Sequence, residues 1–165
     1  MITAPRIAST LTSPQLISLV ALRWLIGWHL LYEGVAKLLN PYWTSAGYLS
    51  ESQGPLAFLF IRLAANPSVL GAVDTINIWS LMILGLILLL GLFERPAAVG
   101  GAALLTLYYV CMPPLLSVTS PIPIEGSYLL VNKTLIEAAA LTVLALFPTS
   151  HRIGLDRLLL KDRLR

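Results

Sequence analysis

Ionisable side chains recur at helical spacing within the first long apolar stretch of the sequence. His29, Glu33 and Lys37 follow one another at intervals of four residues, and Arg23 precedes His29 by six. Because a helix turns about 100° per residue, these four side chains lie on one side of it. Charged groups inside an apolar segment are costly unless they are paired or hydrated. The pattern therefore predicts a polar face that is directed into a bundle of helices.

The last long apolar stretch carries a related set, Asn132, Lys133 and Glu137, in which lysine and glutamate are again four residues apart but in reverse order. If the two stretches run antiparallel, both lysines lie at one level and both glutamates roughly 6 Å deeper. We therefore expect contacts between the two stretches, with Glu33 near Lys133 and Lys37 near Glu137.

Two further polar residues, Asp74 and Asn77, stand near the beginning of the second apolar stretch and are expected at a similar level. One polar pocket could then gather Glu33, Lys37, Asp74, Asn77, Asn132, Lys133 and Glu137. The candidate catalytic groups are the carboxylates of Glu33, Glu137 and Asp74. The candidate substrate-binding residues are Lys37, Lys133, Asn132, Asn77 and His29. Two lysines in such a pocket would suit a small anion.

Aromatic residues adjoin the predicted pocket. Trp28, Tyr32 and Trp79 would suit a ring such as a quinone, and they are the candidate cofactor-binding residues. His29 could relay a proton, but a neutral histidine that is hydrogen-bonded inside a bundle is the alternative. The cluster as a whole also has a structural interpretation, in which the charges satisfy one another and fix the register of the helices.

The composition of the chain indicates that lipid is its solvent. Its 165 residues are 57% hydrophobic and 12% charged, and the mean hydropathy is +0.81. A bilayer core about 30 Å thick requires roughly 20 apolar residues per helix. We predict an all-α integral membrane four-helix bundle, a single domain over 1–165, with spans at about 16–39, 76–93, 97–118 and 128–147.

The connections between these spans predict their orientation. Lys and Arg gather in the tail 148–165, whereas the first connection contains only Arg62 and the third none. The positive-inside rule then places both termini in the cytoplasm, in a multi-pass protein of the inner (plasma) membrane. The apolar run 56–65 in the first connection is too short to span and predicts an outer interfacial helix. In the tail, leucines alternate with basic residues, which is typical of a cytoplasmic amphipathic helix on an anionic leaflet.

Several kinds of chemistry are disfavoured by the sequence. Cys111 is the only cysteine, so an internal disulfide or a Cys-x-x-Cys redox pair is excluded. The only two histidines are His29 and His151, and His151 lies beyond the last span, so they are not expected to ligate one haem. No zinc, iron–sulfur, P-loop or dinucleotide motif is present, and nucleic acid is not an expected partner. We expect no metal or haem, and electron transfer would require an organic cofactor, a direct substrate-to-acceptor step or a partner subunit.

The stretch Gly85 to Ala98, GLILLLGLFERPAA, resembles the hairpin between the second and third spans of the DoxX/DoxD family. In that family a leucine-rich helix with glycines turns at an arginine that small residues follow. The first span is similar as well, with Gly27, Glu33-Gly34 and Lys37 ahead of Asn40-Pro41.

The resemblance covers roughly 16–147 and implies a small four-helix membrane protein of redox metabolism, since some relatives are subunits of thiosulfate:quinone oxidoreductase. On that basis Glu33 and Lys37 would be pocket residues. The chain departs from the family at Ser80-Leu81, in the turn where relatives often place an acid. The role of that acid would have to be supplied by Asp74, Lys133 and Glu137.

These observations lead to two functional hypotheses. The first is a quinone-linked membrane oxidoreductase component in which Lys37 and Lys133 hold a small sulfur anion such as thiosulfate and Glu33 or Glu137 passes protons. The second is a non-catalytic membrane subunit or assembly factor whose buried charge pairs are structural and which docks a partner subunit or forms a homo-oligomer. A small-solute transporter ranks last, because only Arg23 supplies polarity toward the inner side.

Overall fold

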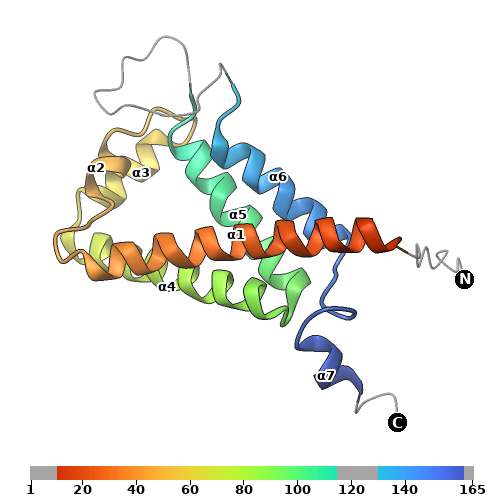
Figure 1. Ribbon diagram of the computed structural model, residues 1–165. Coiled ribbons are helices and arrows are strands. Elements are labelled where there is room, and N and C mark those ends of the chain that lie inside the picture. Colours follow the sequence, from red (N-terminus) through yellow and green to blue (C-terminus); the bar gives the residue numbers. More distant parts are fainter. Residues whose placement is uncertain (1–10, 115–129, 162–165) are drawn as a thin grey trace, which may run out of the picture.

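The computed structural model describes residues 11–114 and 130–161, and this part of the chain folds into helices without strands (Figure 1). Its long helices are α1 (Ser13–Leu39), α4 (Pro67–Leu90), α5 (Glu94–Cys111) and α6 (Lys133–Leu146). Its short helices are α2 (Ala46–Ser50), α3 (Ala57–Ala64) and α7 (Asp156–Lys161). The all-α prediction is confirmed, and α1 and α4 are long and apolar enough to cross a membrane. The predicted third connection, 119–127, lies outside the described residues.

Helix α4 begins at Pro67 and not at the predicted Ile76. The side chain of Asn66 accepts hydrogen bonds from two backbone N–H groups of the following turn, at 3.2 and 3.3 Å. Asparagine is a strong N-cap and proline is well suited to the first turn of a helix. The Asn-Pro pair that follows α3 therefore also starts α4, and Asp74 and Asn77 lie inside this helix.

Glycines bring α1 and α4 into close antiparallel contact. A Cβ atom added to Gly85 of α4 would lie 2.5 Å from the backbone N of Leu31 and 2.7 Å from the carbonyl O of Gly27, so the two backbones touch. In lipid, where apolar burial supplies little drive for association, such close approach is a main source of helix pairing. The glycines thus fix α1, which carries most of the polar side chains, against α4.

Small residues make a second close pair between α5 and α6. Ala97, Ala98 and Gly101 are buried, and a Cβ atom on Gly101 would lie 3.0 Å from Cδ1 of Leu141. The two pairs share one apolar core, to which all four long helices contribute, with members that include Leu30, Leu81, Leu105 and Leu144. Figure 1 shows the pairs meeting near the turn between α4 and α5 and diverging toward α2 and α3.

The first connection packs on the far end of α5. The backbone N–H groups of Gln53 and Gly54 donate to the carbonyl O of Cys111, at 3.2 and 3.3 Å. The hydroxyl group of Tyr48 donates to the carbonyl O of Tyr108, at 2.9 Å. The predicted helix of this connection is present as α3, with α2 before it, and together they occupy the space where the two helix pairs diverge.

The chain after α6 folds back onto the turn between α4 and α5. Gly91 ends α4 in the left-handed region (φ 63°), and the backbone N–H groups of Leu155 and Asp156 donate to the carbonyl groups of Leu90 (3.0 Å) and Gly91 (3.1 Å). A Cβ atom on Gly91 would lie 2.8 Å from the Cα of Gly154, so only glycine fits there. The described part of the predicted tail is therefore a docked loop followed by the short helix α7, which lies in the segment where an amphipathic helix was predicted.

Candidate functional site

Side chains from α1, α4, α5 and α6 line a polar cavity of about 110 Å³. The residues of the predicted site that line this polar cavity together are His29, Glu33, Lys37, Lys133 and Glu137. The other residues that line it are Leu30, Leu81, Leu105, Tyr108 and Thr134. The structure thus brings the polar faces of α1 and α6 to one space.

The ion pairs in the polar cavity differ from those expected. Nδ1 of His29 lies 2.6 Å from Oε1 of Glu137 and links α1 to α6, while Lys37 donates to Glu33 within α1. Among the described residues, Glu33 does not pair with Lys133, and Lys37 does not pair with Glu137. A glutamate four residues before a lysine is the favoured orientation for a pair within one helix, so Glu33 and Lys37 pair with each other. Glu137 then meets His29, which lies one turn before Glu33 on α1.

The polar cavity has a partly exposed rim on α1. The side chains of His29 and Glu33 are 41% and 43% exposed, whereas those of Lys37 and Glu137 are 18% and 14% exposed. The ammonium group of Lys37 also lies 5.6 Å from the centre of the Trp43 ring, which is a cation–π distance. The cavity therefore combines charged groups that are held in pairs with a rim at which two of the side chains stay partly exposed.

Tyr108 of α5 is a cavity residue that the sequence analysis did not single out. Its hydroxyl group donates to Oδ1 of Asn77 on α4, at 2.5 Å. Because a tyrosine joins an apolar ring to a polar group, a tyrosine within an apolar helix is a signal for a polar partner nearby. Asn77, a predicted site residue, therefore reaches the cavity through Tyr108 and does not line it.

Asp74 and Asn132, also predicted as site residues, hold helix ends and loops and do not line the cavity. Asp74 accepts hydrogen bonds from Oγ1 of Thr44 (2.8 Å) and from the backbone N–H of Ser45 (2.9 Å), which ties α4 to the connection before α2. Asn132 is the N-cap of α6, where its side chain accepts from the backbone N–H of Leu135 (2.9 Å). The prediction began α4 too late and α6 too early, which gave both side chains the wrong environment.

The three aromatic residues predicted to hold a ring do not line the polar cavity. Trp28 and Tyr32 are each 62% exposed on the surface of α1. Trp79 is half-exposed and lines a separate apolar groove of about 750 Å³ between α4 and α5, together with Ile76, Ile83, Leu104 and Leu107. Trp79 therefore belongs to an apolar space that is separate from the polar cavity.

A second polar centre, the Arg23–Glu94 network, closes the opposite end of the bundle. Arg23 and Glu94 are each 1% exposed, and Nη1 of Arg23 lies 3.2 Å from Oε2 of Glu94. Arg23 also donates to Oγ1 of Thr149 and to the carbonyl O of Ile153, both at 2.8 Å. The backbone N–H groups of Thr149 (2.7 Å) and Ser150 (2.5 Å) donate to the same oxygen of Glu94. From the sequence, Arg23 was expected on the same side of its helix as His29, but this network was not predicted.

Asp156 stands at the edge of the Arg23–Glu94 network, at the beginning of α7. Its Oδ1 accepts a hydrogen bond from the backbone N–H of Phe93, at 3.0 Å. Burial acts to raise the pKa of Asp156, but hydrogen bonds, including those from the backbone N–H groups of Phe93 and Glu94, hold the pKa below its ordinary value. The carboxylate is therefore ionised near neutral pH and holds α7 to the turn between α4 and α5.

The chemistry of the cavity has to be inferred from its own residues. Within residues 11–114 and 130–161, no three His, Cys, Asp or Glu side chains are grouped so that they could hold a metal ion. Comparisons of the chain with protein-family models, with curated proteins and with solved structures find no match.

Proposed function

We propose that this is an integral protein of the inner (plasma) membrane that crosses the bilayer four times, through α1, α4, α5 and α6, with both termini in the cytoplasm. These helices share one core yet expose large apolar side chains, such as Leu25 (70%), Ile76 (66%), Val99 (58%) and Ile136 (59%). Apolar surface on every long helix suits a lipid environment. Reporter fusions should place the connection with α2 and α3 outside the cell and the tail inside. A cytoplasmic α3 would contradict this topology.

We further propose that the polar cavity binds a small oxyanion such as thiosulfate, within a quinone-linked oxidoreductase component. The observation that carries this proposal is that Lys37, Lys133 and His29 line the same small space as two carboxylates. At about 110 Å³, the cavity is smaller than the engineered cavity of about 150 Å³ that takes up benzene. It therefore suits a small anion and not a substituted quinone ring.

The apolar groove beside Trp79 would receive the quinone. Ile76 lines this groove, and the next residue, Asn77, accepts the hydrogen bond from Tyr108, which lines the polar cavity. This hydrogen bond connects residues of the two spaces. In the reaction, two thiosulfate ions form one S–S bond and give tetrathionate, and the two electrons released, with two protons, convert quinone to quinol. The groups that would pass the protons are Glu33, Glu137 and His29.

Purified protein in lipid nanodiscs should reduce a soluble quinone analogue when thiosulfate is added. Lys133→Gln removes one cationic group from the cavity and should lower the thiosulfate-dependent rate by about tenfold or more. Arg62→Gln removes the same charge from α3, outside the cavity, and should leave the rate unchanged. The proposed activity is rejected by the absence of thiosulfate-dependent reduction together with the absence of bound quinone in mass spectra.

The ion pairs inside the polar cavity favour a second candidate function, which is structural. Glu33 and Glu137 each have a basic partner, in Lys37 and His29, as expected of charges that only fix the register of helices. The protein would then be a non-catalytic membrane subunit or assembly factor. Co-purification of a stoichiometric partner subunit that is retained in Lys133→Gln would support this function. Thiosulfate-dependent quinone reduction by the isolated chain would reject it.

A further inference from the structure

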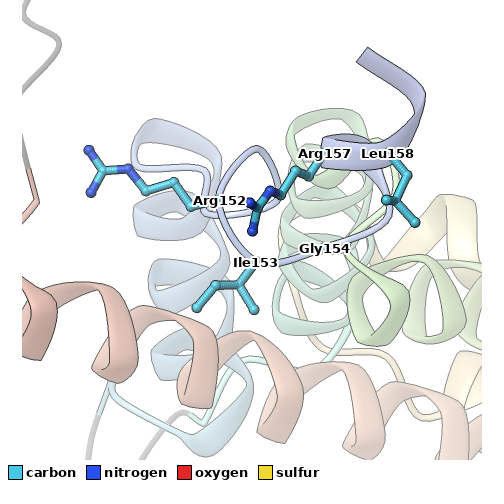
Figure 2. A pocket seen from close by; sticks show the side chains of 5 residues that line it. All are labelled: Arg152, Ile153, Gly154, Arg157 and Leu158. Carbon is cyan, nitrogen blue, oxygen red and sulfur yellow. The ribbon is translucent and has the colours of Figure 1, made fainter. Parts of the chain in front are cut away.

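The loop between α6 and α7 forms a basic pocket at the end of the molecule that the proposed topology places in the cytoplasm. This pocket has a volume of about 430 Å³ and is lined by Arg152, Ile153, Gly154, Arg157 and Leu158 (Figure 2). Figure 2 shows Arg157 reaching back across the loop, while Arg152 extends away from it on the side where α1 begins. Both arginines are exposed, so their guanidinium groups are accessible to a ligand.

Hydrogen bonds to the rest of the bundle fix the backbone of this loop. Arg23 donates to the carbonyl O of Ile153 at 2.8 Å, and the backbone N–H of Leu155 donates to the carbonyl O of Leu90 at 3.0 Å. Nη1 of Arg152 donates to the carbonyl O of Leu11 at 3.0 Å, which leaves its other N–H groups for a ligand. A ligand would therefore meet a pocket that is already formed, which lowers the entropic cost of binding.

The charge of the basic pocket is not neutralised by the carboxylate nearest in sequence. Asp156 lies between the two arginines along the chain, but it is 7% exposed and its carboxylate accepts from the backbone N–H of Phe93. Among the described residues, neither Arg152 nor Arg157 forms an ion pair. The pocket therefore presents positive charge together with exposed apolar side chains, Ile153 (40%) and Leu158 (64%).

We infer that the basic pocket binds the phosphate group of an anionic phospholipid from the inner leaflet. The planar guanidinium group donates two parallel hydrogen bonds to phosphate, which favours arginine at such sites. The exposed Ile153 and Leu158 would contact the glycerol backbone and the start of the acyl chains, a contact that free phosphate does not make. The position of this pocket at the membrane surface rests on the proposed topology and does not depend on any reaction at the polar cavity.

Titration with lipid in mild detergent tests this site, with bound ligand counted by native mass spectrometry. The ligands are phosphatidylglycerol, phosphatidylcholine and inorganic phosphate. We expect one tightly bound phosphatidylglycerol per chain, and weaker binding of phosphatidylcholine, whose headgroup carries no net charge. Arg157→Gln should weaken phosphatidylglycerol binding about fivefold, as expected for one basic residue near a membrane surface. Arg157→Lys keeps the charge but loses the paired donors and should fall between Arg157→Gln and the parent.

Arg95→Gln is the matched control. Arg95 is exposed near the same end of the bundle, at the beginning of α5, but does not line the basic pocket. It should change phosphatidylglycerol binding less than twofold. An equal loss in Arg95→Gln and Arg157→Gln would show a diffuse positive surface and overturn the site. Equal binding of phosphatidylcholine, or displacement of the lipid by an equal concentration of inorganic phosphate, would overturn an anionic phospholipid as its ligand.

Two measurements distinguish a failure of the proposed lipid site from a failure of the proposed topology or of the proposed quinone reduction. Reporter fusions that place the tail outside the cell would overturn the topology, and with it the inner leaflet as the source of the lipid, even if the titration shows the pocket to bind phosphatidylglycerol. Loss of quinone reduction in Arg157→Gln would show that the loop affects the polar cavity, whereas unchanged reduction with weaker lipid binding is the result expected. Thermal unfolding of each variant in detergent confirms that binding is lost from folded protein.

Discussion

The two polar centres of the bundle differ in how completely their charges are enclosed. In the Arg23–Glu94 network both charged residues are 1% exposed, and the carboxylate accepts from Arg23 and from two backbone N–H groups. In the polar cavity, by contrast, the side chains of His29 and Glu33 are 41% and 43% exposed. The charges of the cavity surround about 110 Å³ of space. A ligand can enter the second centre, whereas the first is filled by its own chain.

The same helix, α1, supplies residues to both centres, so the difference comes from what packs against each end of it. At the Arg23 end, the chain after α6 folds back and brings backbone N–H groups that saturate Glu94. At the His29 end, only side chains, from α4, α5 and α6, face α1 across the cavity. The returning backbone fills the first centre, where only Nε of Arg23 and Oγ of Ser150 are buried without a hydrogen-bond partner among the described residues, whereas side chains that meet across four helices leave a void. Charges in an apolar helix are thus structural in the first case and candidates for function in the second.

The largest effect that this comparison predicts is the loss of stability in Glu94→Ala. The variant leaves Arg23 buried without its partner and removes the acceptor for the N–H groups of Thr149 and Ser150. Breaking a buried pair by removing one partner costs about 3–5 kcal/mol, so we expect a loss of this size. Chemical unfolding in detergent, followed by circular dichroism, measures it.

A double variant, Arg23→Leu with Glu94→Leu, is the control for this prediction. Replacing both members of a buried pair by apolar residues is often neutral or stabilising, so the double variant should recover part of the stability that Glu94→Ala loses. A loss below about 1 kcal/mol in Glu94→Ala would show that water reaches the network and would remove the contrast between the two centres.

Helix content and the polar face of α1 could be predicted because hydropathy and the spacing of four residues are local properties of the chain. The beginning of α4 could not be predicted in the same way. Asn66-Pro67 is a sequence that both ends a helix and starts one, and the prediction used only the first property. Asp74 was therefore placed at the beginning of the second span and in the pocket, although it lies inside α4 and accepts a hydrogen bond from the backbone N–H of Ser45.

The ionisable residues that α1 and α6 contribute to the polar cavity were predictable from periodicity, but the partner that each of them contacts was not. Lys37 and His29 are eight residues apart on α1, so an axial shift of about two helical turns, roughly 12 Å, decides which of them Glu137 meets. Such a shift depends on how α6 packs on the whole bundle. Glu94 could not be predicted as buried for a related reason, since its hydrogen-bond donors come from Thr149 and the residue after it, which are far away in the sequence.

Glu137→Ala tests the polar cavity, the less enclosed of the two polar centres, and should lower the free energy of unfolding less than Glu94→Ala does. Glu137 contacts His29, whose side chain is 41% exposed and can be hydrated when its partner is lost. We expect a loss of about 1 kcal/mol, because exposed partners recover most of their interactions from water. The same unfolding assay in the same detergent gives the value. A loss as large as that of Glu94→Ala would make the cavity a structural network and would favour the non-catalytic function.

The smallest effect expected is a pH dependence at the edge of the Arg23–Glu94 network. Because folding lowers the pKa of Asp156, its contribution to stability is fully present above its ordinary pKa, about 3.9, and is lost as the pH falls through the lower folded pKa. Protonation weakens the hydrogen bond that Asp156 accepts from the backbone N–H of Phe93. Hydrogen exchange of the Phe93 amide, corrected for the intrinsic effect of pH, should therefore become faster below about pH 4.

The Leu135 amide provides the control for this prediction within the same molecule. It donates to Oδ1 of Asn132, a side-chain amide that does not titrate, so its corrected exchange rate should not change over the same range. In Asp156→Asn the Phe93 amide should lose its pH dependence and behave as the Leu135 amide does. If the two amides respond equally to pH in the parent protein, the titrating group is not Asp156. The tail would then be held at this end by Glu94, by Arg23 and by the backbone hydrogen bonds to Leu90 and Gly91, without a contribution from the Asp156 carboxylate.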